Sequence, residues 1–192
     1  MAAVSSTRAF STAQPLESES ELLIRCQRYE GEALTEFFDR FHDRVFDFLV
    51  ARTGDAVLAE DLTRETFIRA LGLLPKQRNR GGGLGPWLLR VANGRLAERR
   101  RPQGQARPGD PPPAIPANEG PGMEAARLRA ALDLLPIEQQ EVLSLRLLAR
   151  LPVNVVARAV HRGARATRGL QTRGLKALDR LLVPVADSAG TD

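Results

Sequence analysis

A proline- and glycine-rich segment at residues 102–122 divides this 192-residue chain and limits what it can fold into. Its sequence is PQGQARPGDPPPAIPANEGPG. Proline lacks a backbone N–H donor and glycine does not stiffen the backbone, so neither a helix nor a strand can persist here. We therefore predict a linker over 102–123 that joins two folded units, at 19–101 and 124–182.

The two ends of the chain carry no apolar periodicity. Residues 1–18 are rich in Ser, Thr and Ala, and the last residues, 183–192, read VPVADSAGTD. Segments that cannot bury enough apolar surface do not offset the entropy of ordering. We predict that both ends are disordered tails.

Both units show helical periodicity, and no alternating segment flanked by hairpin turns indicates a strand. We therefore predict an all-α fold of two small helical domains. In the first unit Gly54 and Pro75 are each expected to end a helix, and in the second Pro136 and Pro152 are each expected to begin one. In the first unit an apolar stripe recurs at spacings of three and four, namely Leu34, Phe37, Phe38, Phe41, Val45, Phe46 and Leu49.

The formal net charge is +5, and the charges are segregated along the chain. Residues 17–65 hold thirteen acidic residues against six arginines, whereas 76–107 and 146–180 each carry nine basic residues against one acidic residue. Two basic blocks suggest two contacts on one polyanion, because such an excess attracts phosphates and binds by releasing counterions. A solubilising arginine-rich surface would give the same pattern, and charge alone does not decide between the two readings.

The composition excludes several classes. One cysteine cannot form an internal disulfide, and the two histidines, His42 and His161, are not spaced as zinc ligands, so we expect a reducing compartment and no metal. No apolar run approaches the roughly 20 residues of a membrane helix, and no secretory signal begins the chain, which favours a cytoplasmic protein. The sequence has no grouped nucleophile and base and no phosphate-binding glycine loop. We therefore expect neither an enzyme nor a cofactor.

The second unit has the pattern of a helix-turn-helix. A short helix around 153–160 is followed by His161-Arg162-Gly163 and then by a longer helix with Leu170, Leu175, Leu178 and Leu181 on its inner side. This arrangement can lay a recognition helix in the major groove, although a plain helical hairpin has the same pattern. The candidate DNA-binding residues are Arg162, Arg165, Thr167, Arg168, Gln171, Thr172, Arg173 and Lys176.

Three segments resemble a known family. AEDLTRETFIRAL (59–71) and PWLLRVANGRLAERRR (86–101) look like region two of the sigma-seventy family of RNA polymerase sigma factors, in its extracytoplasmic-function or group-four class. Residues 131–181, from ALDLLPIEQQ to LKALDRL, resemble region four of the same class. Their order and separation make the resemblance specific.

The resemblance implies a dissociable subunit that guides core RNA polymerase to promoters. Its partners would be the clamp of the largest polymerase subunit, the flap of the second largest, promoter DNA and an anti-sigma factor. The DLTRETF helix would dock on the clamp through Asp61, Leu62, Arg64, Glu65 and Phe67, with the polar residues favoured for docking and Leu62 and Phe67 for core packing.

The resemblance also implies promoter recognition. The loop 75–85 would hold an extruded base of the minus-ten element, and the following helix would contact the non-template strand. Trp87 is expected to be structural. The minus-ten candidates are Gln77, Arg78, Asn79, Arg80, Arg90, Asn93, Arg95, Arg99 and Arg100, and the outer face of helix 164–178 would read the minus-thirty-five element.

Four positions put promoter reading by the second unit in doubt. Val155 stands where the family usually has an acidic residue, and His161 where it has the glycine of the turn. A non-glycine residue is disfavoured in a left-handed turn, so the turn could be remodelled. Gly169 and Gly174 weaken a helix by up to about 1 kcal/mol each relative to alanine. The alternative is a sigma-like co-regulator that binds polymerase or a regulator without recognising promoters on its own.

Overall fold

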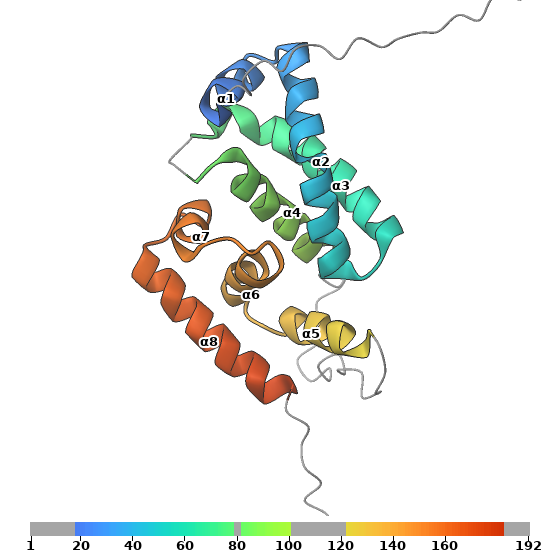
Figure 1. The fold of residues 1–192 in the computed structure, drawn as a ribbon, viewed down its shortest axis with the longest axis vertical. Coiled ribbons are helices and arrows are strands. Elements are labelled where there is room, and N and C mark those ends of the chain that lie inside the picture. The colour runs from blue at the N-terminus through green and yellow to red at the C-terminus, as the bar shows by residue number, and fades with distance from the viewer. Residues whose placement is uncertain (1–17, 79–81, 101–121, 183–192) are drawn as a thin grey trace, which may run out of the picture.

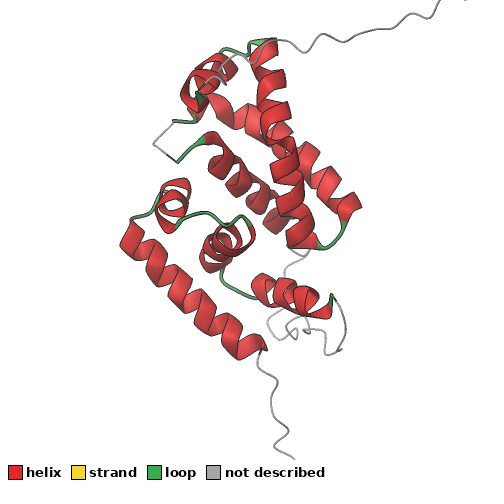
Figure 2. Ribbon diagram, viewed as in Figure 1, coloured by secondary structure: helices red, strands yellow, loops and turns green. Residues whose placement is uncertain are grey.

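The computed structural model describes residues 18–78, 82–100 and 122–182, and every regular element within them is helical (Figures 1 and 2). The predicted all-α fold is therefore confirmed. The predicted tails, except Ser18, and the linker up to 121 lie outside the described residues. The elements are α1 (Glu19–Gln27), α2 (Gly31–Thr53), α3 (Ala56–Leu73), η1 (Leu74–Lys76), α4 (Leu84–Arg100), α5 (Met123–Asp133), α6 (Ile137–Leu143), η2 (Ser144–Leu148), α7 (Val153–Ala159) and α8 (Ala164–Leu182).

Local sequence signals set the helix ends in the first part of the chain. Ser18 and Glu21 form a capping box at the start of α1. Gly54 ends α2 with a left-handed φ of 74°, a conformation that glycine adopts without steric cost, and the Asp55 carboxylate then accepts bonds from two backbone N–H groups of α3. Pro75 lies just beyond α3, in the short helix η1. The predicted breaks at Gly54 and Pro75 are confirmed.

Local sequence signals also set the helix starts in the second part of the chain. Pro136 is the residue directly before α6 and Pro152 the residue directly before α7, where a missing N–H donor is harmless. Between these helices the chain makes one π-helical turn, η2. His161 adopts a left-handed φ of 54° before α8 begins. The turn therefore keeps the conformation that a glycine would favour, and histidine is one of the non-glycine residues most often found there.

Helices α1–α4, which we call the first group, pack directly on α5–α8, the second group (Figure 1). Helix α4 lies between them and contacts α2 and α3 on one side and α6, η2 and α7 on the other. A single apolar cluster runs through both groups, and its members from the second group include Val142, Leu145, Leu151, Val156 and Val160. Two separate bodies were expected from the sequence, whereas the described residues share a core.

The predicted apolar stripe of α2 faces this core. Phe37, Phe41, Val45 and Leu49 are almost fully buried, whereas Phe38 is 43% exposed. On α8, Leu170 and Leu178 are buried as expected, and Leu175 is 41% exposed. A smaller second cluster, formed by Ala131, Leu132, Leu135, Leu143 and Leu178, lies entirely within the second group. The second group thus depends on both clusters for burial of its apolar side chains.

The packing of α8 on α6 explains why a glycine stands at position 174, which the sequence alone does not reveal. A Cβ atom at this position would lie 2.7 Å from Leu143 Cδ1 and 3.2 Å from Leu143 Cγ. Leu143 is itself fully buried and has little room to move. The absent side chain therefore lets α8 approach α6 closely. At Gly169 the only atom that a new Cβ would meet is Nη1 of Arg173, at 3.5 Å.

These two glycines give opposite predictions for the same substitution. We expect Gly169→Ala to raise the free energy of unfolding by up to about 1 kcal/mol, because alanine restricts the unfolded chain and favours a helix. We expect Gly174→Ala to lower it by about 1–3 kcal/mol, because overpacking against Leu143 outweighs that gain. Urea unfolding followed by circular dichroism measures both. Equal stabilisation by the two variants would show that α6 and α8 do not pack this closely.

Candidate nucleic-acid interface

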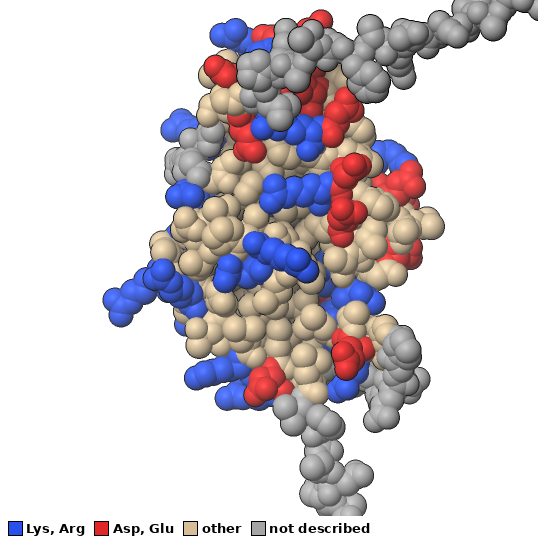
Figure 3. Space-filling model, in the orientation of Figure 1, with Lys and Arg blue, Asp and Glu red and all other residues tan. Residues whose placement is uncertain are grey.

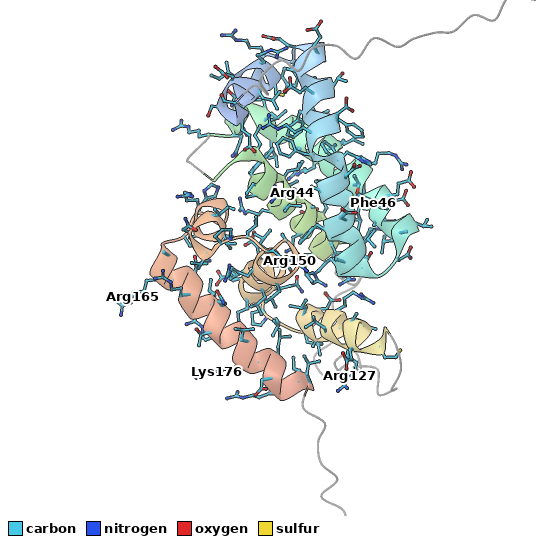
Figure 4. The ribbon with its side chains drawn as sticks, viewed as in Figure 1. Arg44, Phe46, Arg127, Arg150, Arg165 and Lys176 are labelled. Atoms are coloured by element: carbon cyan, nitrogen blue, oxygen red, sulfur yellow. The ribbon has the colours of Figure 1, made fainter. Side chains whose placement is uncertain are left out.

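The outward face of α8 carries cations and has no acidic residue before Asp179. Arg165 and Lys176 point away from the body of the molecule (Figure 4). In the space-filling view, basic side chains also project from the side formed by α7 and α8, whereas acidic ones gather on the side of α2 and α3 (Figure 3). Five of the predicted DNA-binding residues, which we call readers, are exposed on this face: Arg165, Arg168, Thr172, Arg173 and Lys176.

Three predicted readers near α8 are placed differently. Thr167 is fully buried, and its hydroxyl donates to the carbonyl oxygen of Gly163, so its predicted contact with DNA is not compatible with this packing. Gln171 is half-buried, and its Oε1 accepts a bond of 3.2 Å from Nε of Arg146. Arg162 is paired with Glu138 of α6. Helical periodicity explains the first two, because 167, 170, 171, 174 and 178 lie on one face of α8.

The arginines of α4, predicted to contact the minus-ten element, are all paired with carboxylates. Glu65 of α3 accepts bonds from Arg95 at 2.8 Å and Arg99 at 2.7 Å, and Arg95 also pairs with Glu98. The hydrogen bond to Glu65 raises the pKa of Arg95, and burial opposes it. Glu65 was predicted to bind polymerase, yet its carboxylate joins α3 to α4.

The two other α4 arginines reach the second group. Nε of Arg90 donates to Oε1 of Glu141 on α6 at 2.9 Å. Arg100 pairs with Asp133, the last residue of α5. Asn93 is 2% exposed, so the predicted contact of its side chain with DNA is not compatible with this packing. These partners lie 33–51 residues away in sequence, so helical spacing could not have shown them.

Asp133 has a second partner that the sequence analysis missed. Arg52 of α2 is 1% exposed, and its Nη2 donates to Oδ1 of Asp133 at 2.6 Å. Burial lowers the pKa of Arg52, and the Asp133 carboxylate opposes this shift. One signal was available, because Arg52 continues the stripe of Val45 and Leu49 at helical spacing. A charged residue on such a stripe indicates a buried partner.

Gln77 and Arg78, at the start of the loop 75–85, lie beside His161 in the turn of the helix-turn-helix. Nε2 of Gln27 donates to the carbonyl oxygens of Leu74 and Gln77, at 3.0 and 2.7 Å, and so holds the start of the loop. An open pocket of about 290 Å³ is lined by Lys76, Gln77, Arg78 and His161. The predicted residues Asn79 and Arg80 lie outside the described residues. Trp87 is 5% exposed, in keeping with the structural role expected for it.

On α3 the predicted polymerase-binding residues divide by burial. Leu62 and Phe67 are buried, and the Phe67 ring packs against Phe37 and Phe38 at centroid distances of 5.6 and 4.8 Å. Arg64 is largely exposed and pairs with Asp61 at 3.1 Å, in an i,i+3 geometry. The packing role favoured for the two apolar residues agrees with the structure, and two polar residues remain available to a partner.

In 18–78, 82–100 and 122–182, no group of three or more His, Cys, Asp or Glu side chains is arranged to hold a metal ion. Within these same ranges, no helix has the length and apolar character needed to span a bilayer.

Fold and surface together define an all-α protein with a helix-turn-helix in its second group. Residues 37–105 match the family model "Sigma-70 region 2". The chain is 32% identical over 171 residues to the ECF RNA polymerase sigma factor BldN of Streptomyces coelicolor. The match covers 84% of this chain and 65% of BldN, so the chain spans less than two thirds of that relative's length. It is 29% identical over 174 residues to SigD of Mycobacterium tuberculosis, covering 83% of this chain and 82% of SigD.

Solved structures share the fold. CnrH, in complex with the cytosolic domain of CnrY, aligns with a TM-score of 0.58 at 18% identity over 86% of this chain and 97% of that chain. RpoE of Bartonella quintana, in complex with the anti-sigma factor NepR, aligns with a TM-score of 0.53 at 17% identity over 77% and 95%. Residues 37–105 thus belong to the sigma-70 family, and the chain is similar to sigma factors of the extracytoplasmic-function class over most of its length.

The shared carboxylate of Glu65 leads to a prediction for the free chain. Glu65→Gln removes the charge that holds Arg99, so we expect tighter binding to nonspecific duplex DNA. The slope of log K against log salt should steepen by about 0.9 for one added phosphate contact. Fluorescence anisotropy at several salt concentrations measures this slope. Glu60→Gln is the control, because Glu60 pairs only with Arg64 of its own helix. An unchanged slope in Glu65→Gln would contradict the prediction.

Proposed function

We propose that this chain is a sigma factor that binds core RNA polymerase and directs initiation at a specific set of promoters. The exposed face of α8 carries this proposal, because it presents five polar or basic donors outward, directly after the turn of a helix-turn-helix, and no acidic residue before Asp179. The match of residues 37–105 to the sigma-70 family supports it. The proposal places the protein in the cytoplasm and assigns it no catalytic activity.

Polymerase docking is assigned to α3. Asp61 and Arg64 are exposed on a helix whose opposite face is held in the core by Leu62 and Phe67. A rigid helix of this kind presents its polar side chains at fixed positions, which reduces the entropy lost on binding. The clamp of the largest polymerase subunit is the proposed partner of this surface, and the flap of the second largest is the proposed partner of the second group.

Promoter recognition is assigned to two surfaces. The loop 75–85, with Gln77 and Arg78, and the arginines of α4 would bind the minus-ten element. The exposed readers of α8 would bind the minus-thirty-five element, where arginine favours guanine and each bidentate contact contributes about 1–3 kcal/mol of discrimination. Because Gln171 is turned toward Arg146, it is not offered as a reader of adenine.

An anti-sigma factor is the proposed regulatory partner. RpoE is described in complex with the anti-sigma factor NepR, and CnrH with the cytosolic domain of CnrY. We extend only the class of partner to this chain, and the residues that it would contact are not assigned.

A second candidate is the sigma-like co-regulator without independent promoter recognition. The inward positions of Thr167 and Gln171 favour it, because they leave fewer readers on α8 than the sequence suggests. The two candidates differ in whether the chain and core polymerase alone can open a promoter.

Polymerase docking can be tested with a charge exchange on α3. The double variant Asp61→Arg, Arg64→Asp keeps an i,i+3 ion pair, so the helix should remain stable, but it inverts the charges that a partner meets. We expect its affinity for purified core polymerase to fall at least about tenfold, a loss of about 1.4 kcal/mol. Biolayer interferometry measures the affinity, and Glu32→Lys, at a fully exposed position on α2, is the control. Unchanged affinity would exclude this surface.

Promoter recognition can be tested by reversing charges on α8. With core polymerase, the chain should initiate at a subset of genomic promoters in runoff mapping, and Arg165→Glu with Arg168→Glu should abolish initiation while polymerase binding persists. Arg28→Glu, on the exposed turn after α1, is the control. If polymerase binds the unaltered chain but no promoter opens, the co-regulator is the correct assignment.

A further inference from the structure

Gln27, the last residue of α1, binds the chain at Gln77, one of the proposed minus-ten residues. Its Nε2 donates to the carbonyl oxygens of Leu74 and Gln77, at 3.0 and 2.7 Å. A side-chain amide has two N–H donors, so both bonds can form at once. The short helix η1 ends at Lys76, so the carbonyl of Gln77 is held by this side chain and not by a continuing helix. Gln27 thus fixes the backbone from which the Gln77 side chain extends.

Glu19, the first residue of α1, binds the chain at the start of α4. Its Oε2 accepts a bond of 2.6 Å from the backbone N–H of Leu84, the first residue of α4. The first N–H groups of a helix have no partner within that helix, so the Glu19 carboxylate caps α4 from a different element. Its negative charge also suits the partial positive charge at a helix N-terminus. Glu19 thus fixes the point at which α4 begins.

Gly83 leaves room for this cap. Its φ of 80° lies in the left-handed region that favours glycine, and a Cβ atom at this position would lie 2.8 Å from Oε2 of Glu19. A side chain at 83 would therefore push the carboxylate away from the N–H of Leu84. The glycine is explained by the approach of α1 to the backbone at this place.

Helix α1 is itself firmly held. Its inner side is buried in the core through Leu22, Leu23 and Cys26. It has 9 residues and is about 14 Å long, at about 1.5 Å per residue. Because Glu19 and Gln27 are the two ends of this anchored helix, α1 sets the position of Gln77 relative to the first residue of α4.

The chemistry of the two side chains suits support and not contact with DNA. Glu19 carries a negative charge, which would repel a phosphate. The Nε2 of Gln27 already donates to two backbone carbonyl oxygens. Both side chains therefore act on the backbone of residues that precede or begin the proposed minus-ten surface.

We propose that Glu19 and Gln27 are positioning residues for the minus-ten surface, acting through Leu84 and Gln77 without touching DNA. Extrusion of a base is costly, and a surface that is already ordered loses less entropy when it receives one. Promoter opening should therefore depend on these two residues, whereas polymerase docking by α3 and duplex binding by α8 should not. The proposal rests on the proposed function for the identity of the surface. The contacts themselves can be measured without DNA.

The first experiment measures hydrogen exchange at the backbone amide of Leu84 by NMR, in the free chain. We expect Glu19→Ala to accelerate this exchange at least about tenfold, because the cap that protects the N–H is lost. Glu19→Gln keeps an oxygen that can accept, so it should retain most of the protection. Glu32→Ala, which removes a fully exposed carboxylate at the start of α2, is the control. Unchanged exchange in Glu19→Ala would overturn the proposal for Glu19.

The second experiment measures promoter opening with core polymerase, on a promoter that the unaltered chain opens. Permanganate, which oxidises unpaired thymines, reports the rate of opening at saturating enzyme. We expect Glu19→Ala and Gln27→Glu to lower this rate about tenfold, because misplaced groups contribute little to a demanding step. Glu19→Gln should restore it. Ile24→Glu is the control for Gln27→Glu, because it adds the same charge to α1 at a half-exposed position away from both contacts.

The affinities separate positioning from a general loss of structure. In the same variants, we expect the affinity for core polymerase and for promoter duplex to change by less than about twofold. A parallel fall of affinity and opening rate would show a merely structural role and overturn the proposal. Equal opening rates in all variants would overturn it while leaving the proposed function intact. If the unaltered chain opens no promoter, the proposal and the proposed function are both wrong, whatever the exchange at Leu84.

Discussion

The ion pair between Arg52 and Asp133 ties the stability of one half of the structure to the position of the other. Arg52 is almost fully buried, and both its Nε and its Nη1 lack a partner atom. A buried guanidinium without a carboxylate is strongly disfavoured, because little of its lost hydration is replaced. Among the described residues, the carboxylate that pairs with it is that of Asp133 on α5. Loss of Asp133 would therefore leave the Arg52 guanidinium buried without a carboxylate.

The interface between the groups is polar as well as apolar. A purely apolar junction would be hard to separate, since all of its buried area would have to meet water again. Arginines that lose a carboxylate can instead gain a phosphate or water. The pairs of Arg90 with Glu141 and Arg100 with Asp133 are only partly buried, so exchanging their partners has a modest cost.

Sequence patterns predicted the elements of the fold well and their contacts poorly. Gly54, Pro75 and Pro152 act on the backbone of their immediate neighbours, so their effect could be inferred locally. The partners of the α4 arginines depend on how distant helices pack, which no short pattern encodes. The sequence likewise overestimated the number of hydrogen-bond donors on the outward face of α8, because Thr167 and Gln171 lie on the side of the helix that packs against the rest of the second group.

The two proposed DNA surfaces differ in their access to solvent. Arg165 and Lys176 of α8 point away from the body of the molecule (Figure 4). Arg90 and Arg100 of α4 are instead paired with carboxylates of the second group. Gly174 contributes to this difference, because it lets α8 pack tightly on α6 and so keeps its polar side outward whatever the position of the first group. The outward face of α8 is therefore accessible in this packing, whereas the α4 arginines would have to exchange a carboxylate for a phosphate in order to bind DNA.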